Sequence, residues 1–341
     1  MTAPVTHILP LTLIRRTRLL PAAGNVLVHS GQRVNALDIV AETFRFPDHQ
    51  MIDVAKIFQA EQANELEEWL QVKPGDQLQV GDVIAQKKGL LRKVVRAQQA
   101  GKVVSIVNGQ VWIEGTGKKF ELRAGYSGVV SEVIPERGIV VTTHGALIQA
   151  AWGNGKIEES PIVYNPRSED EELLPDMIDI AFRGGIVFSG YCGSAEVLQQ
   201  AASLPLRGII LGSMAAELVP LAISMPYAII LTEGFGRIPV NHNVYTILTS
   251  NTDRQISMLA SCWDPSSGDR PEITISLPAE GKEPKEITMF RTGQQVRFLG
   301  EPVAGEVGLL ENLDQENRIG VVRLTSNQRI HVPLVNLDVL E

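Results

Sequence analysis

An internal repeat constrains the fold of this chain more than any other feature of its sequence. Residues 28–41 and 72–85 share the spacing of their apolar residues, and each copy reads as a strand, a glycine turn and a second strand ending in alanine. The turns fall at Gly31 and Gly75, and glycine readily supplies the positive φ that such turns require. A shorter repeat links 97–104 with 124–131. Four strand-turn units predict a pseudo-symmetric β-sandwich or barrel.

A helical insertion interrupts the two long copies. Residues 54–70 carry a partial helical period that places Leu66, Trp69 and Leu70 on one face. We therefore expect a β-rich domain over 25–160 with a helical insertion near 54–70 that caps it. Residues 1–24 are left as an N-terminal segment.

The pattern of residues 72–85, followed by Ala97, Ala100 and Gly101, resembles the biotinyl/lipoyl-like superfamily, also called the barrel-sandwich hybrid. In carrier members of that family, a lysine at the hairpin tip is biotinylated or lipoylated. Here the tip falls on Leu90 and Leu91. The resemblance therefore implies a module without the modifiable lysine, which serves structure or docking, and no cofactor is expected.

In the middle of the chain, the spacing of the apolar residues changes. Residues 178–188, 208–211 and 227–232 read as strands, and 194–202, 215–221 and 252–260 as helices. Short continuous apolar runs that alternate with helices favour βαβ units and a small parallel sheet covered on both faces. This predicts a small α/β domain over 176–262, preceded by a solvated acidic linker at 168–172.

The last part of the chain is strand-like. Residues 263–286 are rich in proline and read as a linker with one strand at 273–277, and 287–341 alternate strands and turns. The segment 287–341 resembles a KOW-type SH3-like barrel, which binds RNA or protein in transcription and translation factors. The fold class is thus multi-domain α/β and all-β: a barrel-sandwich hybrid, a small parallel α/β sheet and a C-terminal SH3-like barrel.

Charge favours protein over nucleic acid as the partner. The chain carries a net charge of -8, and residues 290–341 hold five arginines, no lysine and seven acids. A nucleic-acid binder needs a basic face to neutralise phosphates. RNA binding would require Arg291, Arg297, Arg323 and Arg329 to gather on one face, and the three arginines among residues 1–30 read as a solvated tail.

Three glycine-containing loops form the candidate ligand site. Ligands of open α/β sheets bind beyond the carboxyl ends of the strands, and loop N–H groups often hold an anion there. Glu233 is a candidate general base without an identifiable partner, so no residue is assigned as catalytic. Ser194 is better explained as a helix N-cap. The candidate ligand-binding residues are Gly193, Ser194, Gly212, Ser213, Thr232, Glu233, Gly234, Gly236 and Arg237.

Several functional classes find no support. The six histidines lack metal-ligand spacing, and Cys192 and Cys262 read as buried hydrophobes rather than a disulfide or zinc site. No apolar run reaches the ~18 residues that cross a bilayer. The N-terminal charges follow the apolar stretch, the reverse of a secretory signal, so a cytoplasmic location is expected.

These observations favour a non-enzymatic adaptor that docks on protein partners. One alternative is a sensor or enzyme that binds a small anionic ligand through the α/β loops. Another is a transcription- or translation-associated factor that binds RNA through the C-terminal barrel. A carrier modified on Lys87, Lys88 or Lys93 is the remaining possibility.

Overall fold

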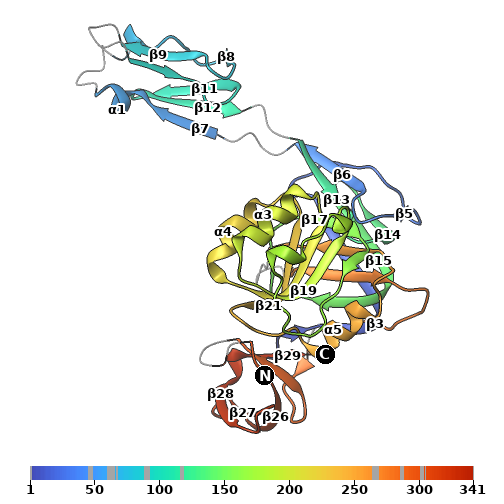
Figure 1. Cartoon of the computed structure of the whole chain (residues 1–341). Helices are drawn as coiled ribbons and strands as arrows, with labels where there is room; N and C mark the ends of the chain where they lie inside the picture. Colours follow the sequence, from blue (N-terminus) through green and yellow to red (C-terminus); the bar gives the residue numbers. More distant parts are fainter. Residues whose placement is uncertain are drawn as a thin grey trace. The chain divides into compact units, whose positions relative to one another are not determined.

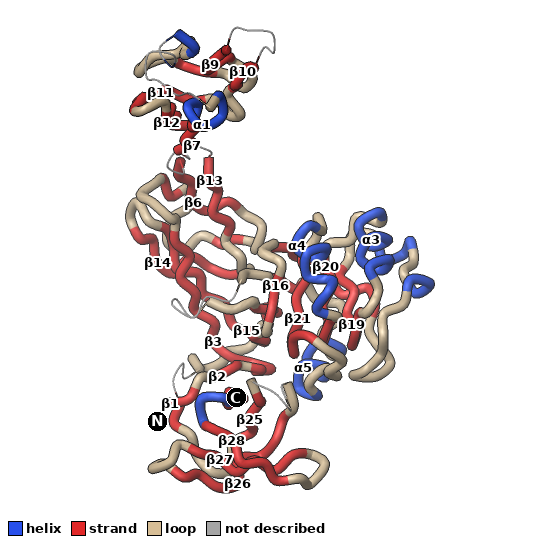
Figure 2. Tube along the Cα trace, turned by 90° about the vertical axis from the view of Figure 1, so that its left-hand side faces the viewer, coloured by secondary structure: helices blue, strands red, loops and turns tan. Residues whose placement is uncertain are grey.

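The computed structural model is rich in strand and divides into two compact units (Figures 1 and 2). Strands hold 49% of the described residues and helices 14%, which confirms a mostly β structure. Unit 1 comprises Met1–Leu19, Val26–Val40 and Leu122–Glu341, and unit 2 comprises Leu20–Asn25 and Ala41–Glu121. The predicted domain 25–160 contributes residues to both units. The structure describes residues 2–44, 49–59, 66, 68–87, 93–115, 119–262, 269–284, 288–299, 303 and 305–340.

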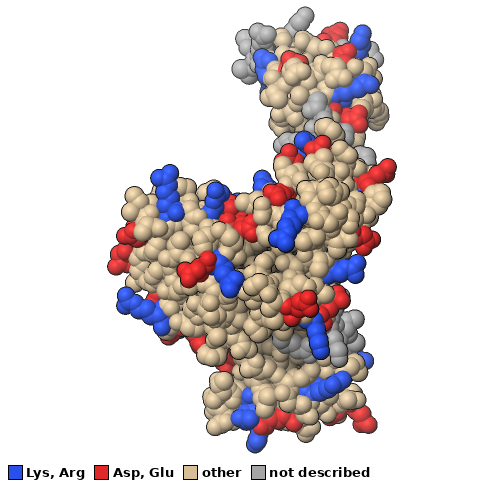
Figure 3. All heavy atoms as spheres, turned by 90° about the vertical axis from the view of Figure 1, so that its right-hand side faces the viewer, with Lys and Arg blue, Asp and Glu red and all other residues tan. Residues whose placement is uncertain are grey.

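Charged side chains of both signs are spread over the surface. On the face drawn in Figure 3, lysines and arginines alternate with aspartates and glutamates. No helix within the described ranges combines the length and the apolar character needed to cross a bilayer.

Strand β15 (Gly138–Gln149) is the centre of a seven-stranded antiparallel sheet in unit 1. One side of β15 pairs along its length with β3 (Ile8–Leu19), and the other side pairs first with β14 and then with β23. The remaining strands extend the sheet outward from β14 and β23. These strands are β14 (Gly128–Ile134), β5 (Arg33–Val34), β23 (Glu272–Ser276), β22 (Ile256–Leu259) and β17 (Ile157–Ser160).

The N-terminal segment is part of this sheet, so the prediction of a solvated tail is wrong. Strand β3 accommodates Pro10 because the pairing shifts register between Leu9 and Thr12, which leaves the proline in a bulge. Its arginines meet acids of the same sheet: Arg15 pairs with Glu132 and Arg16 with Glu272. The strand predicted at 273–277 is confirmed as β23, one residue earlier, but it is an inner strand of the sheet and not an interruption of a linker.

A five-stranded sheet packs with one face against the seven-stranded antiparallel sheet. Four of its strands run parallel, in the order β21, β20, β19, β18, and β16 (Trp152–Gly153) adds an antiparallel edge. Helices α3 (Ala195–Ser203) and α4 (Val219–Ser224) cover one face. The parallel strands are β18 (Ile162–Tyr164), β19 (Ile186–Cys192), β20 (Gly208–Met214) and β21 (Ala228–Phe235).

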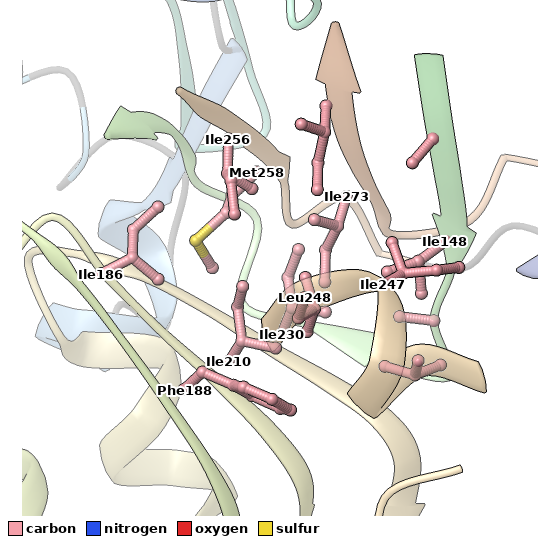
Figure 4. Close-up of a cluster of buried hydrophobic side chains, with 14 of the residues drawn as sticks. Ile148, Ile186, Phe188, Ile210, Ile230, Ile247, Leu248, Ile256, Met258 and Ile273 are labelled. Atoms are coloured by element: carbon pink, nitrogen blue, oxygen red, sulfur yellow. The ribbon is translucent and has the colours of Figure 1, made fainter. Parts of the chain in front are cut away.

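The other face of the parallel sheet is covered by the antiparallel sheet and by α5 (His242–Thr249). Ile186, Phe188 and Ile210 of the parallel strands meet Met258 and Ile273 of the antiparallel strands in one buried cluster (Figure 4). Burying each large apolar side chain contributes ~1.5–3 kcal/mol. The predicted cover on both faces is therefore confirmed, although one cover is mainly a sheet.

Two predicted elements differ from the structure in type or in bounds. The helix predicted over 252–260 is wrong: helix α5 ends at Thr249, and residues 256–259 form strand β22, whose side chains are all buried. The strand predicted over 178–188 begins only at Ile186, after the 3-10 turns Pro175–Met177 and Ile180–Phe182. Asn241 marks the start of α5, because its side chain accepts a hydrogen bond from the Asn243 N–H.

The C-terminal residues form a six-stranded sheet around their own apolar cluster. Strand β25 pairs with both β26 and the last strand, β29, and β2 near the N-terminus adds to β29 in parallel. A two-stranded ladder joins β1 (Thr2–Ala3) to β24 (Thr288–Met289). The six strands are β2 (Val5–Thr6), β29 (Leu337–Leu340), β25 (Gln295–Phe298), β26 (Val307–Asp314), β27 (Ile319–Leu324) and β28 (Arg329–Pro333), with the 3-10 turn Leu334–Asn336 before β29.

Unit 2 is built from a four-stranded sheet and a two-stranded one around a shared cluster. The four-stranded order is β7 (His49–Asp53), β12 (Gln110–Gly115), β11 (Gly101–Val107), β8 (Gln77–Leu78). Strands β9 (Val83–Lys87) and β10 (Lys93–Arg96) pair with each other, and α1 (Val54–Phe58) begins the predicted insertion, whose Leu66, Trp69 and Leu70 pack with this cluster. A further sheet has the order β13 (Lys119–Arg123), β6 (Ile39–Phe44), β4 (Asn25–Val26). Leu90 and Leu91 lie outside the described residues.

The sequence repeat is also a structural repeat. In unit 2, the Ala97 N–H donates to the Asp82 carbonyl at 2.8 Å, and in unit 1 the Ala124 N–H donates to the Asp38 carbonyl at 2.9 Å. The turn glycines are equivalent as well: Gly75 N–H donates to Val103 and Gly31 N–H to Val130. Each short copy therefore pairs with one long copy, once in each unit.

A buried carboxylate ties three strands of the seven-stranded sheet. Glu272 on β23 accepts hydrogen bonds from Arg16 on β3 at 2.8 Å, from Gln149 on β15 at 2.9 Å and from Tyr126 at 2.7 Å. Burial alone would raise the pKa of Glu272, but the Arg16 guanidinium and these hydrogen bonds lower it overall below its usual value. The ionised form is therefore the one that the fold stabilises.

We expect Glu272→Gln to reduce the stability of unit 1 by about 3 kcal/mol at pH 7, because the Arg16 guanidinium loses its counter-charge. The pKa of Glu272 is depressed in the folded chain, so its contribution is full above the unfolded value of 4.5 and is lost as the pH falls below it. Urea unfolding from pH 7 to pH 3 measures this. If the difference in unfolding free energy between wild type and Glu272→Gln stayed the same from pH 7 to pH 3, Glu272 would not stabilise the fold in its ionised form.

Candidate functional site

The parallel sheet brings the predicted ligand-binding residues to one edge. Strands β19, β20 and β21 run in the same direction, with Cys192 beside Met214 and Ser213 beside Gly234. Their carboxyl ends and the loops that follow therefore lie together, as the sequence predicts. Gly234 and Gly236 both have positive φ, which lets the chain turn after β21.

An acidic segment occupies this edge. The Gly190 N–H donates to the Glu171 carbonyl at 2.9 Å, the Val240 N–H donates to the Glu169 carbonyl at 2.8 Å, and Glu172 forms a β-bridge with Tyr191. The prediction of a solvated linker at 168–172 is thus wrong. Carboxylates at this position oppose the binding of an anion by the neighbouring N–H groups.

The polar side chains of the predicted site are held by local structure. Ser194 is the N-cap of α3, and its hydroxyl accepts from the Glu196 N–H at 3.2 Å. The Ser213 hydroxyl donates to the Ile238 carbonyl at 2.7 Å and accepts from the Ile238 N–H at 3.0 Å. These contacts fix the loops, so neither hydroxyl is positioned as a nucleophile.

Arg237, which the sequence predicts as an anion-binding residue, is engaged by two neighbours. Its guanidinium forms an ion pair with Glu172 and lies over the Tyr191 ring at 4.8 Å from the centroid. The Glu172 carboxylate thus takes the position that an anionic ligand of Arg237 would need.

Glu233, the candidate general base, is buried in an ion pair with Arg297 of strand β25. The Arg297 Nη2 atom lies 2.7 Å from Glu233 Oε2, and the two side chains are 6% and 2% exposed. The Asn241 N–H donates to the other carboxylate oxygen at 3.1 Å, and Arg297 Nη1 donates to the Thr232 carbonyl at 3.4 Å. A carboxylate held by this pair is not free to take a proton from a substrate.

Three of the four arginines that could gather for RNA binding are paired with acids of the chain. Arg323 and Arg329 both bind Glu311, at 2.5 and 2.7 Å, and their hydrogen bonds lower the pKa of its carboxyl. Arg297 is buried against Glu233. The positive charges of these three arginines are therefore offset by acids of the chain itself.

Unit 2 exposes a group of apolar side chains that the sequence did not single out. Trp112 on β12 lies opposite Met51 on β7, and β11 adds Val104 and Val107. These side chains are 38–53% exposed, whereas Val111 and Ile113 point into the core from the other face of β12. We call Met51, Val104, Val107 and Trp112 the Trp112 face. Strand alternation was its only sequence signal.

Among the described residues, no group of three or more histidines, cysteines, aspartates or glutamates is arranged so that it could hold a metal ion. Cys192 is buried as predicted, and burial raises the pKa of its thiol to about 11. Cys262 is exposed, so the prediction that it is buried is wrong.

No protein-family model matches the chain, and no curated protein matches its sequence.

We predict that Arg297→Met destabilises unit 1 by about 3–5 kcal/mol, because it leaves the Glu233 carboxylate buried without a counter-charge. The double variant Glu233→Gln/Arg297→Met removes both charges and should recover much of that loss. Urea unfolding of the single and double variants measures the coupling.

Arg329→Met serves as the matched control, since it removes one arginine from an exposed pair and should cost less than about 1 kcal/mol. A double variant that is as unstable as the sum of its single variants would show that Glu233 and Arg297 do not interact.

Proposed function

We propose that this protein is a non-enzymatic adaptor that docks on a protein partner through the Trp112 face of unit 2. The single observation that carries the proposal is an exposed tryptophan beside an exposed methionine and two exposed valines on one face of a sheet. Tryptophan and methionine are enriched at the centres of protein interfaces, and tryptophan often dominates their binding energy.

The charges around the Trp112 face fit the same proposal. Lys102 and Glu114 are cross-strand partners at its rim, whereas the four central side chains are uncharged. Interfaces characteristically have an apolar centre, depleted of charge, inside a polar rim. The partner is therefore a protein surface with its own apolar patch.

The arrangement of the predicted site supports a role without catalysis. Glu233 is held by Arg297, Arg237 by Glu172, and Ser194 and Ser213 by backbone groups. A catalytic base or nucleophile needs freedom to meet a substrate. The RNA-binding alternative receives no support from Arg323 and Arg329, which share Glu311.

We further infer that unit 2 is a barrel-sandwich hybrid module and that the six-stranded sheet is an SH3-like barrel. The first inference rests on two small sheets around one cluster and on the repeated Ala97–Asp82 pairing. The second rests on a meander from β25 to β28 that the last strand, β29, joins to β25. A cytoplasmic location stays a prediction.

Site-specific photocross-linking in the native cell tests the adaptor proposal. A photoreactive residue at Val107, on the Trp112 face, should form a defined adduct with one partner protein. Adding Trp112→Glu should abolish that adduct, because a buried unpaired carboxylate opposes association.

The matched control is a photoreactive residue at Val80, which is 69% exposed in the turn before β9 and lies off the Trp112 face. It should not form this adduct. Adducts that are the same at both positions, or that survive Trp112→Glu, would overturn the proposal. An adduct with a second copy of this chain would make the Trp112 face a self-association surface instead.

A further inference from the structure

A cavity of about 470 Å³ lies in unit 1 next to Glu233, at the carboxyl end of β21. Its size falls within the ~300–1,000 Å³ of small-molecule sites. Its position also fits, since ligands of α/β sheets bind beyond the carboxyl ends of the strands. Nothing in the proposed docking function uses this cavity.

The walls of the cavity are largely apolar. Two large side chains at the cavity keep substantial exposure: Phe235 at 38% and Leu299 at 53%. A ligand that covers such exposed apolar side chains removes apolar surface from water, and this stabilises the complex. The apolar lining comprises Ala150, Ala151, Phe235, Ile238, Phe298 and Leu299.

The four ionisable side chains in the walls cancel in charge. Glu233 pairs with Arg297 at 2.7 Å, and Asp338 pairs with Arg270 at 3.4 Å. An anionic or cationic ligand therefore gains no net attraction from the cavity and loses its hydration on entry. A neutral ligand avoids that cost.

Three buried polar atoms of lining residues form no hydrogen bond: the donors Arg297 Nε and Nη2, of which Nη2 lies in the ion pair with Glu233, and the acceptor Asp338 Oδ1. Their side chains are only 6% and 4% exposed. Buried polar groups are normally satisfied, and such exceptions often mark a site for a missing partner. A ligand group that both donates and accepts hydrogen bonds could satisfy either kind of atom.

We propose that this cavity binds a neutral, largely apolar small molecule that carries a hydrogen-bonding group such as a carboxamide. The apolar walls take the body of the ligand, and Arg297 or Asp338 takes its polar end. This ligand class differs from the anion that the loop sequences predict.

The proposal is tested on the full chain with N-phenyl-1-naphthylamine, an uncharged probe that fluoresces in apolar sites. Wild type should bind it saturably. Two competitors of similar size then measure whether the cavity prefers a neutral or an anionic ligand. We expect 1-naphthamide to displace the probe at a concentration at least about tenfold lower than 1-naphthoate, because only 1-naphthoate must bury a charge.

Two variants locate the binding. Ala151→Trp fills the cavity from a position that is already exposed, and Leu299→Glu places a charge in its lining. Each should weaken probe binding at least tenfold. The matched controls Ala216→Trp and Ile223→Glu, at exposed positions away from the cavity, should leave it unchanged, as should Trp112→Glu on the proposed docking face.

Thermal melts establish that each variant is folded. Absence of saturable binding in wild type, unchanged binding in both folded cavity variants, or tighter binding of 1-naphthoate would each overturn the proposal. None of these results bears on the adaptor proposal, because the Trp112 face belongs to the other unit.

Discussion

The pairing of β15 with β3 is the interaction on which the rest of unit 1 depends. It runs antiparallel from Gly138 opposite Leu19 to Ile148 opposite Ile8, and so joins the N-terminal residues to the middle of the chain. The other side of β15 pairs with β14 and then with β23. Gly145 permits the close approach of β23, since a Cβ there would lie 1.9 Å from the Ile275 carbonyl oxygen.

The seven-stranded sheet around β15 also packs against one face of the parallel sheet. The shared apolar cluster fixes β19, β20 and β21, and their carboxyl ends carry the groups that the sequence singles out. Buried ion pairs then connect segments far apart in the chain: Arg16 with Glu272, and Glu233 with Arg297. Buried ion pairs often add little net stability, and we infer that these two pairs select one arrangement of the strands.

The sequence predicted those features that depend on local patterns. The repeat around Gly31 and Gly75, the buried strands at 208–211 and 227–232, and the N-cap at Ser194 are all present, because turn chemistry, apolar runs and capping act over a few residues. Strand β3 was missed because Pro10 and three arginines are typical of a tail, and only distant partners make them compatible with a sheet. The Glu233–Arg297 pair was missed for the same reason, since no local signal links the two residues.

Hydrogen–deuterium exchange at single-residue resolution tests most directly whether β3 and β15 form one continuous ladder. We expect the amides of β3 that face β15 to exchange as slowly as those in the centre of β15, because both open only when unit 1 unfolds. Rapid exchange throughout residues 8–19, with β15 still protected, would contradict it and would return the N-terminal segment to a tail.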